Sequence, residues 1–166
     1  MENSAYVNEG LKMTTMTIVD VINILYPGQW ALGNVTFGED VTGPIFITSW
    51  NVPNQKQPDF ASLEAQIPQL QAQFDLSYFT TIGTPQLAAY IDSIAHQKQY
   101  DNAVSLATYI NSTAPSWIAE AKTFLLWRDA VYNYAIAQIA LMPSGQRRVT
   151  TFTEFQSELP LIVWPD

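Results

Sequence analysis

The pattern of hydrophobic and polar positions in the first third of the chain predicts a helix followed by a β-hairpin. Apolar residues at positions 18, 21, 22 and 25 fall at helical spacing, and Pro27-Gly28 then ends the helix. Two β-rich runs, 30–37 and 44–50, are separated by a loop with two glycines and an Asp, which suit a hairpin. Residues 1–16 are polar and lack periodicity, so we expect a flexible N-terminal arm there.

The stretch 51–58 is polar, contains two prolines and shows no periodicity, which indicates a linker. Asp59 is a good N-cap for a following helix, which Pro68 is expected to interrupt before a partly ordered Gln-rich end. The sequence therefore predicts a small α+β unit with its linker over 17–58, and a second module over 59–166.

The second module is predicted to be mainly helical. Thr84 as N-cap and Pro85 as first residue begin one helix, a second follows over 101–110, and Thr151 with Glu154 matches a capping box for a short last helix. The longest helix covers about 115–142, and residues 163–165 are expected to be extended. The expected fold is α+β: a small helix and β-hairpin unit, then a mainly α-helical bundle.

The long helix carries more apolar surface than one neighbouring layer covers. Steps of 100° per residue place most of its large side chains on one broad face and three more on a second flank, with a narrow polar strip between. This pattern fits either an entirely intramolecular core or a flank that docks a partner, since large exposed aromatic clusters usually bind something. We expect Trp127, Tyr134 and Leu141 to face a partner, and Trp117, Phe124 and Val131 to lie in the core.

Arg128 falls near the middle of the broad apolar face, where an unpaired guanidinium would be costly. We expect it to pair with a carboxylate and so to act structurally, with ligand recognition as the alternative. The candidate partners are Asp92, Asp101 and Glu158.

Charge and composition narrow the function classes. The net charge of -8 and seven scattered Lys and Arg residues argue against nucleic-acid binding. No apolar run is long enough to span a bilayer and no signal peptide is recognisable, so we expect a cytoplasmic protein. Residues 1–83 carry eight acidic residues against two lysines, whereas residues 84–148 carry four against five basic residues, which suggests two units with different surfaces.

No motif in the sequence indicates a catalytic site, a metal site or a cofactor site. His96 has no second His and the chain has no Cys, so a partly exposed helix histidine is expected rather than a metal ligand or triad member. Glu39-Asp40 suits a solvated turn better than a cation site, and the Arg147-Arg148 pair suits solubility or a rim contact. We therefore expect a non-enzymatic protein with no cofactor.

An ordered string of mostly aromatic, charged and proline positions runs through residues 91–165. Its members are Tyr100, Ser105, Tyr109, Trp117, Glu120, Phe124, Trp127, Arg128, Asp129, Tyr134, Glu158, Pro160, Trp164 and Pro165. This string resembles a module of tailed bacteriophages, found in small tail fibre assembly chaperones or tail accessory proteins. The N-terminal part is more weakly similar through Tyr26-Pro27, Trp50-Asn51 and Pro53, and residues 66–84 do not match.

The resemblance implies a protein that holds the distal part of a trimeric tail fibre while the fibre folds, in the cytoplasm of the infected host. Trp50, which ends the predicted hairpin, joins Trp127, Tyr134 and Leu141 as a candidate partner contact. A permanent virion component at the fibre or baseplate is the first alternative, and self-association remains open. An enzyme acting on host polysaccharide is a third hypothesis, although the convergent carboxylates that it needs are not evident.

Overall fold

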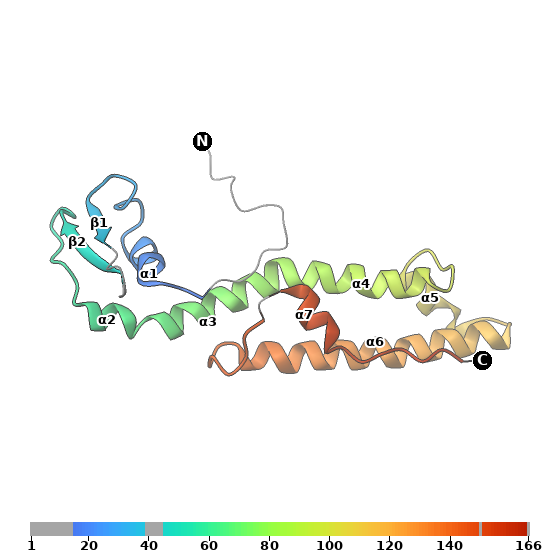
Figure 1. Ribbon diagram of the computed structural model, residues 1–166. Coiled ribbons are helices and arrows are strands. Elements are labelled where there is room, and N and C mark those ends of the chain that lie inside the picture. The colour runs from blue at the N-terminus through green and yellow to red at the C-terminus, as the bar shows by residue number, and fades with distance from the viewer. Residues whose placement is uncertain (1–14, 39–44, 150, 166) are drawn as a thin grey trace. The chain divides into compact units, whose positions relative to one another are not determined.

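The computed structural model describes residues 15–38, 45–149 and 151–165. Among these residues the fold is α+β, with one two-stranded antiparallel sheet followed by a mainly helical C-terminal region, as the sequence predicts. The chain divides into two compact units, Thr14–Ala72 (the small unit) and Gln73–Asp166 (the helical unit). Figure 1 shows the elements in chain order: α1 (Ile18–Leu25), β1 (Val35–Gly38), β2 (Phe46–Trp50), α2 (Phe60–Glu64), α3 (Ile67–Tyr78), η1 (Phe79–Gly83), α4 (Thr84–His96), α5 (Ala103–Thr108), η2 (Tyr109–Asn111), α6 (Pro115–Leu141) and α7 (Phe152–Ser157).

The small unit begins with a well-capped helix. Thr17 and Asp20 form a reciprocal capping box at the start of α1, which satisfies backbone donors that the first turn leaves free. Residue Met16 is buried, and its amide donates to Gln71 Oε1 at 2.6 Å, so the predicted flexible arm does not extend through position 16. Positions 1–14 lie outside the described residues.

The β-hairpin is shorter than its sequence pattern suggests. Residues 30–33 form turns instead of the start of a strand, and Gly28 and Gly33 adopt the positive φ that such turns require. The strands pair with Val35 opposite Trp50 and Gly38 opposite Phe46, and a bulge follows Thr36. The core of the small unit is aliphatic: Met16, Ile18, Val21, Ile22, Val35, Val52 and Leu63.

The helix that Asp59 caps, α2, is interrupted after Glu64, and Pro68 lies in the first turn of the next helix, α3, where its missing N–H would have had no helical acceptor. The Gln-rich stretch after it is fully helical. Because Leu63 and Ile67 pack with the small unit, the division of the chain follows Ala72, later than the linker at 51–58 where the sequence placed it.

A π-helical turn, η1, joins α3 to α4, and it corrects the predicted N-cap at Thr84. The Thr84 amide donates five residues back to the Phe79 carbonyl, and the Thr84 hydroxyl donates to the same oxygen at 3.3 Å. Pro85 has no N–H and its ring would clash with a carbonyl four residues back, which accounts for the widened turn just before it. Thr84 therefore lies inside a continuous helical run.

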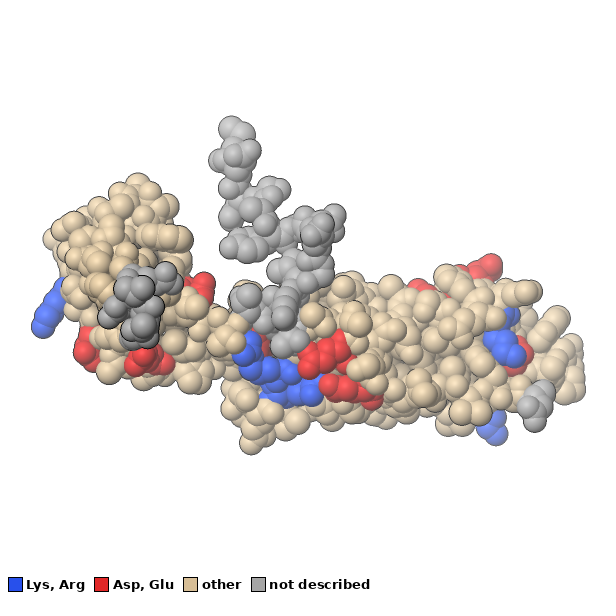
Figure 2. Space-filling model, in the orientation of Figure 1, with Lys and Arg blue, Asp and Glu red and all other residues tan. Residues whose placement is uncertain are grey.

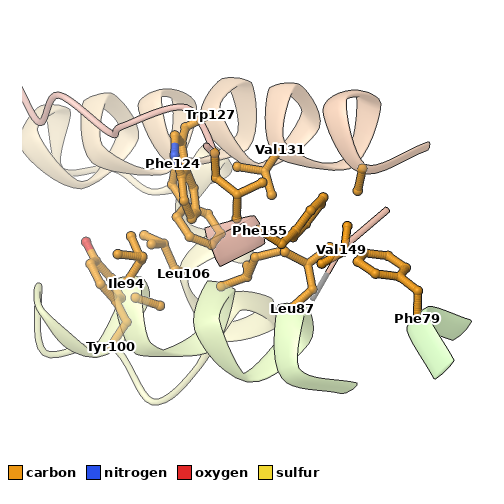
Figure 3. Close-up of a cluster of buried hydrophobic side chains, with 14 of the residues drawn as sticks. Phe79, Leu87, Ile94, Tyr100, Leu106, Phe124, Trp127, Val131, Val149 and Phe155 are labelled. Atoms are coloured by element: carbon orange, nitrogen blue, oxygen red, sulfur yellow. The ribbon is translucent and has the colours of Figure 1, made fainter. Parts of the chain in front are cut away.

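In the helical unit, α4 and α6 run in opposite directions on two sides of one core, and α7 lies between them (Figures 1 and 3). The Asn102 side chain caps α5 by accepting a hydrogen bond from the Ser105 amide, and the Thr151 side chain caps α7 by accepting one from the Glu154 amide. Figure 3 shows side chains from α4, α5, α6 and α7 meeting in this core. Its fully buried members include Phe79, Ile91, Leu106, Phe124, Val131, Met142 and Phe155.

Candidate partner-binding surface

The buried face of α6 contains Trp127, which corrects its expected exposure. Its side chain is 6% exposed, and its indole Nε1–H donates to the Pro160 carbonyl at 2.8 Å. The ring packs at an angle against Tyr90 and Phe124, with centroids 6.0 and 5.6 Å away. Phe124 and Val131 are fully buried on the same face, as the sequence predicts. Trp127 therefore belongs to the core of the helical unit.

Trp117 was expected in the core but is 49% exposed. It lies in the first turn of α6, and its ring packs edge-on against Tyr109, with centroids 5.5 Å apart. Tyr109 in turn packs on the buried Tyr100 at 5.0 Å, so three aromatic rings connect the core to the surface. Angular position on the helix alone therefore misplaced Trp117, because it does not show which part of the apolar face the neighbouring elements cover.

Arg128 pairs with Asp129, the next residue, at 3.1 Å, and with none of the three carboxylates expected from the sequence. The Arg128 and Asp129 side chains are 31% and 61% exposed, so the pair lies at the surface and contributes little stability. The prediction that Arg128 has a structural role through one of these carboxylates is therefore wrong. Other arginines form the ion pairs that join separate elements of this unit.

Arg147 and Arg148, expected to serve solubility or a rim contact, form ion pairs of this kind. Arg147 donates to both oxygens of Glu158 at 2.6 and 2.7 Å, and Arg148 Nε donates to Asp75, a 1% exposed carboxylate, at 3.0 Å. One short loop segment is thereby tied to the end of α7 and to α3. Figure 2 shows basic and acidic side chains gathered together on one part of the helical unit.

Tyr134, a predicted partner contact, is half-buried and joins this ionic cluster. Its hydroxyl donates to Glu158 at 2.6 Å, and its ring lies 5.9 Å from Phe155. The hydrogen bonds from Arg147 and then Tyr134 lower the pKa of the Glu158 carboxyl, and the bond to Glu158 raises the pKa of Tyr134. Tyr134 thus has a structural partner within its own unit.

A second polar cluster joins the segment between α4 and α5 to α6. Lys98 pairs with Glu120 at 3.3 Å, and the buried Tyr100 donates to Glu120 at 2.8 Å. Burial, followed by this hydrogen bond, raises the pKa of Tyr100 to about 12. The Lys98 ammonium also lies 5.4 Å from the centre of the Trp164 ring, within range of a cation–π interaction.

The opposite side of α6 is exposed and mostly apolar. We call this surface the outer face of α6. Leu126 and Ile136 are 66% and 64% exposed, and Leu141, a predicted partner contact, is 38% exposed. Its exposed positions after Lys122 are Leu126, Asp129, Ala130, Tyr132, Asn133, Ile136, Ala137, Ala140 and Leu141. Only Asp129 and Asn133 among these are clearly polar, so this face resembles a docking surface more than a solvated one.

The C-terminal segment, residues 160–165, adds a second exposed apolar surface. Leu161 and Val163 are 85% and 82% exposed, whereas Ile162 and Trp164 pack against the core. Sequence reasoning recognised only residues 163–165 as extended and missed the two exposed positions. The alternation of Leu161, Ile162, Val163 and Trp164 between two prolines cannot show from sequence alone which pair faces inward.

In the small unit, the predicted contact Trp50 is half-buried. Its indole N–H donates to the Gln55 carbonyl at 2.9 Å, and its ring meets Tyr26 edge-on at 4.8 Å. Trp30 and Leu32 are more exposed than Trp50, and both belong to the turns after α1. Trp50 therefore mainly holds the hairpin to its own unit.

His96 and the two nearby aspartates, Asp92 and Asp101, make hydrogen bonds within the α4–α5 region. His96 Nε2 lies 2.7 Å from the Asp101 carbonyl, and Asp92 accepts the Ala103 amide at 2.8 Å, which fastens the start of α5 to α4. No group of three potential metal ligands is found in the described residues. Glu39-Asp40 lies outside them. The geometry thus assigns His96, Asp92 and Asp101 to the α4–α5 connection.

Comparison with known proteins adds no relative. No family model, curated protein or solved structure gives a match to this chain. In the described part of the chain, no helix has the length and apolarity needed to cross a membrane.

Proposed function

We propose that this protein is a non-enzymatic binder that assists the folding and trimerisation of a phage tail fibre, by docking on the distal part of the fibre polypeptide. The observation that carries this proposal is the outer face of α6, where Leu126 and Ile136 lie exposed among alanines. The resemblance of residues 91–165 to tail fibre assembly chaperones gives the proposal its partner.

The physical case starts from what such a partner needs. Intertwined β-rich trimers assemble slowly and expose apolar surface and unpaired strand edges before the chains join. A binder with an exposed apolar face on a well-packed helical unit covers such surface without losing its own structure. The acidic charge of the chain, -8, keeps the binder itself apart from other copies.

Co-expression tests the proposal. The fibre polypeptide of the same phage, produced with this protein, is expected to give more soluble trimer than the fibre alone. The double variant Leu126→Asp/Ile136→Asp is expected to remove that gain, because it takes away the two most exposed aliphatic side chains of the outer face of α6. Asn133→Asp on the same face, which adds charge without removing apolar surface, is the matched control.

Two outcomes bear against the proposal. An unchanged trimer yield with the unaltered protein contradicts the chaperone function itself. Mass spectrometry of purified particles addresses the other possibility: a stoichiometric amount in mature virions indicates a permanent structural component of the fibre or baseplate, whereas a chaperone leaves before the particle is complete.

A further inference from the structure

The C-terminal segment, residues 160–165, alternates between exposed and packed side chains as a β-strand does, and it pairs with no strand among the described residues. Leu161 and Val163 point to solvent while Ile162 and Trp164 pack inward, and this period of two is that of an extended strand. The segment runs back along α6, toward the beginning of that helix (Figure 1). It lies outside the only sheet formed by the described residues.

One hydrogen bond identifies which edge of this segment is open. In an extended chain, the N–H and C=O of one residue point to the same edge, and successive residues alternate between the two edges. The Pro160 carbonyl accepts from Trp127 on α6, so the backbone groups of Ile162 point to that side as well. The amides of Leu161 and Val163 therefore point to the opposite edge, and neither donates a hydrogen bond within the described chain.

The segment is held in place before any partner arrives. Trp164 stacks on Phe124, with ring planes 5° apart and centroids separated by 6.5 Å. The Lys98 ammonium lies over the Trp164 ring as well. Pro160 and Pro165 restrict the backbone at both ends. A partner strand that pairs here does not have to order this edge first, which favours binding.

We propose that the edge formed by Leu161 and Val163 accepts an extended strand of the fibre polypeptide, which adds to it by main-chain hydrogen bonds. This inference rests on the proposed function for the identity of the partner. A helix is excluded as the occupant because its own backbone groups are already paired, whereas an extended chain offers donors and acceptors at the matching period. The two exposed aliphatic side chains then cover apolar side chains on one face of the added strand.

Two variants at one position test the strand. Val163→Pro removes the amide donor, and Ile162 before it keeps the extended conformation that a following proline favours. Val163→Thr keeps the amide and nearly the same side-chain shape. Affinity for the purified distal fragment of the fibre is expected to fall about tenfold for Val163→Pro, because a fibre carbonyl loses its donor, and by less than about twofold for Val163→Thr. Both variants should keep the melting temperature, since Val163 is exposed.

Hydrogen exchange supplies the direct readout. In the complex of the unaltered protein with the fibre fragment, the Leu161 and Val163 amides are expected to exchange at least about tenfold more slowly than in the free protein. If the complex forms but these amides stay unprotected, or Val163→Pro binds as well as Val163→Thr, the strand proposal is overturned and the proposed function stands. If no complex forms, both are overturned. A dimer of the free protein that Val163→Pro dissociates assigns the edge to a second copy, and also overturns the fibre strand as occupant.

Discussion

The core of the helical unit contains five buried aromatic side chains, whereas the buried core of the small unit contains none among the described residues. The helical unit also has ionic pairs between distant elements, Asp75 with Arg148 and Arg147 with Glu158. The small unit relies on aliphatic packing and on one long-range bond from the Met16 amide to Gln71. The two units are therefore stabilised differently: the helical unit by buried aromatic rings and by ion pairs between separate elements, and the small unit mainly by aliphatic packing.

The largest expected effect comes from removing an aromatic side chain from the helical core. Phe124→Ala should lower the free energy of unfolding by about 4 kcal/mol, because the ring is fully buried and leaves a cavity beneath Trp127 and Trp164. Denaturant unfolding followed by circular dichroism measures this loss. Trp117→Ala on the same helix is the control and should cost less than about 1 kcal/mol, since half of its surface is exposed. Equal losses would contradict the assignment of these two faces.

The second effect tests the ionic tie that distinguishes the helical unit. Asp75→Ala should cost about 3 kcal/mol, because it removes a carboxylate that is 1% exposed and leaves the Arg148 guanidinium without that partner. A double-mutant cycle with Arg148→Ala should show a coupling free energy of about 1–2 kcal/mol. Additive losses in the cycle would mean that the two side chains act separately.

The third effect tests the aliphatic core of the small unit. Leu63→Ala should cost about 3 kcal/mol, since Leu63 is fully buried among residues of that unit. Hydrogen exchange read by mass spectrometry should show the loss of protection in peptides from α1, β1 and β2, while the peptides of α6 keep theirs. A loss that is equal in α6 would show that Leu63 stabilises more than its own unit.

The same comparison explains what the sequence could and could not predict. Helix periodicity, together with the capping box at Thr151, located α1, α5, α6 and α7 well, because those signals are local. The core position of Phe124 also followed from angular spacing.

The errors arose where tertiary contacts decide. Trp127 and Trp117 both lie on apolar helix faces, but only the structure shows that the Pro160 carbonyl accepts the Trp127 N–H, and that Trp117 remains half exposed. Arg147 and Arg148 gave no local sign that their partners lie on α7 and α3. Pairing between charged groups distant in sequence has no periodicity, so a pattern cannot reveal it.

The fourth effect concerns pH and the Glu158 cluster. Glu158→Gln should cost about 1.5 kcal/mol at pH 7, because it weakens the bonds from Arg147 and Tyr134. The pKa of this carboxyl is lower in the folded protein than its ordinary value of 4.5, so the stability that it contributes is present above pH 4.5 and is lost as the pH falls below it. The urea midpoints of the unaltered protein and of Glu158→Gln should therefore approach each other as the pH falls from about 5 to about 3. A difference that stays the same over this pH range would contradict the role of the Glu158 carboxylate.

The smallest effect concerns the surface ion pair of Arg128, compared with the ion pair of Arg147 that joins separate elements of the same unit. Arg128→Ala should change the free energy of unfolding by less than about 0.5 kcal/mol, because its partner Asp129 is the next residue and both side chains reach solvent. Arg147→Ala, compared under the same conditions, should cost about 1–2 kcal/mol, since it breaks two bonds to Glu158 that join separate elements. High salt should reduce the small Arg128 effect further and leave most of the Arg147 effect, because the Arg147 pair is less exposed. A loss above about 2 kcal/mol for Arg128→Ala would show that Arg128 has the structural role that its position on the helix suggested. Such a loss would require a carboxylate partner other than Asp129.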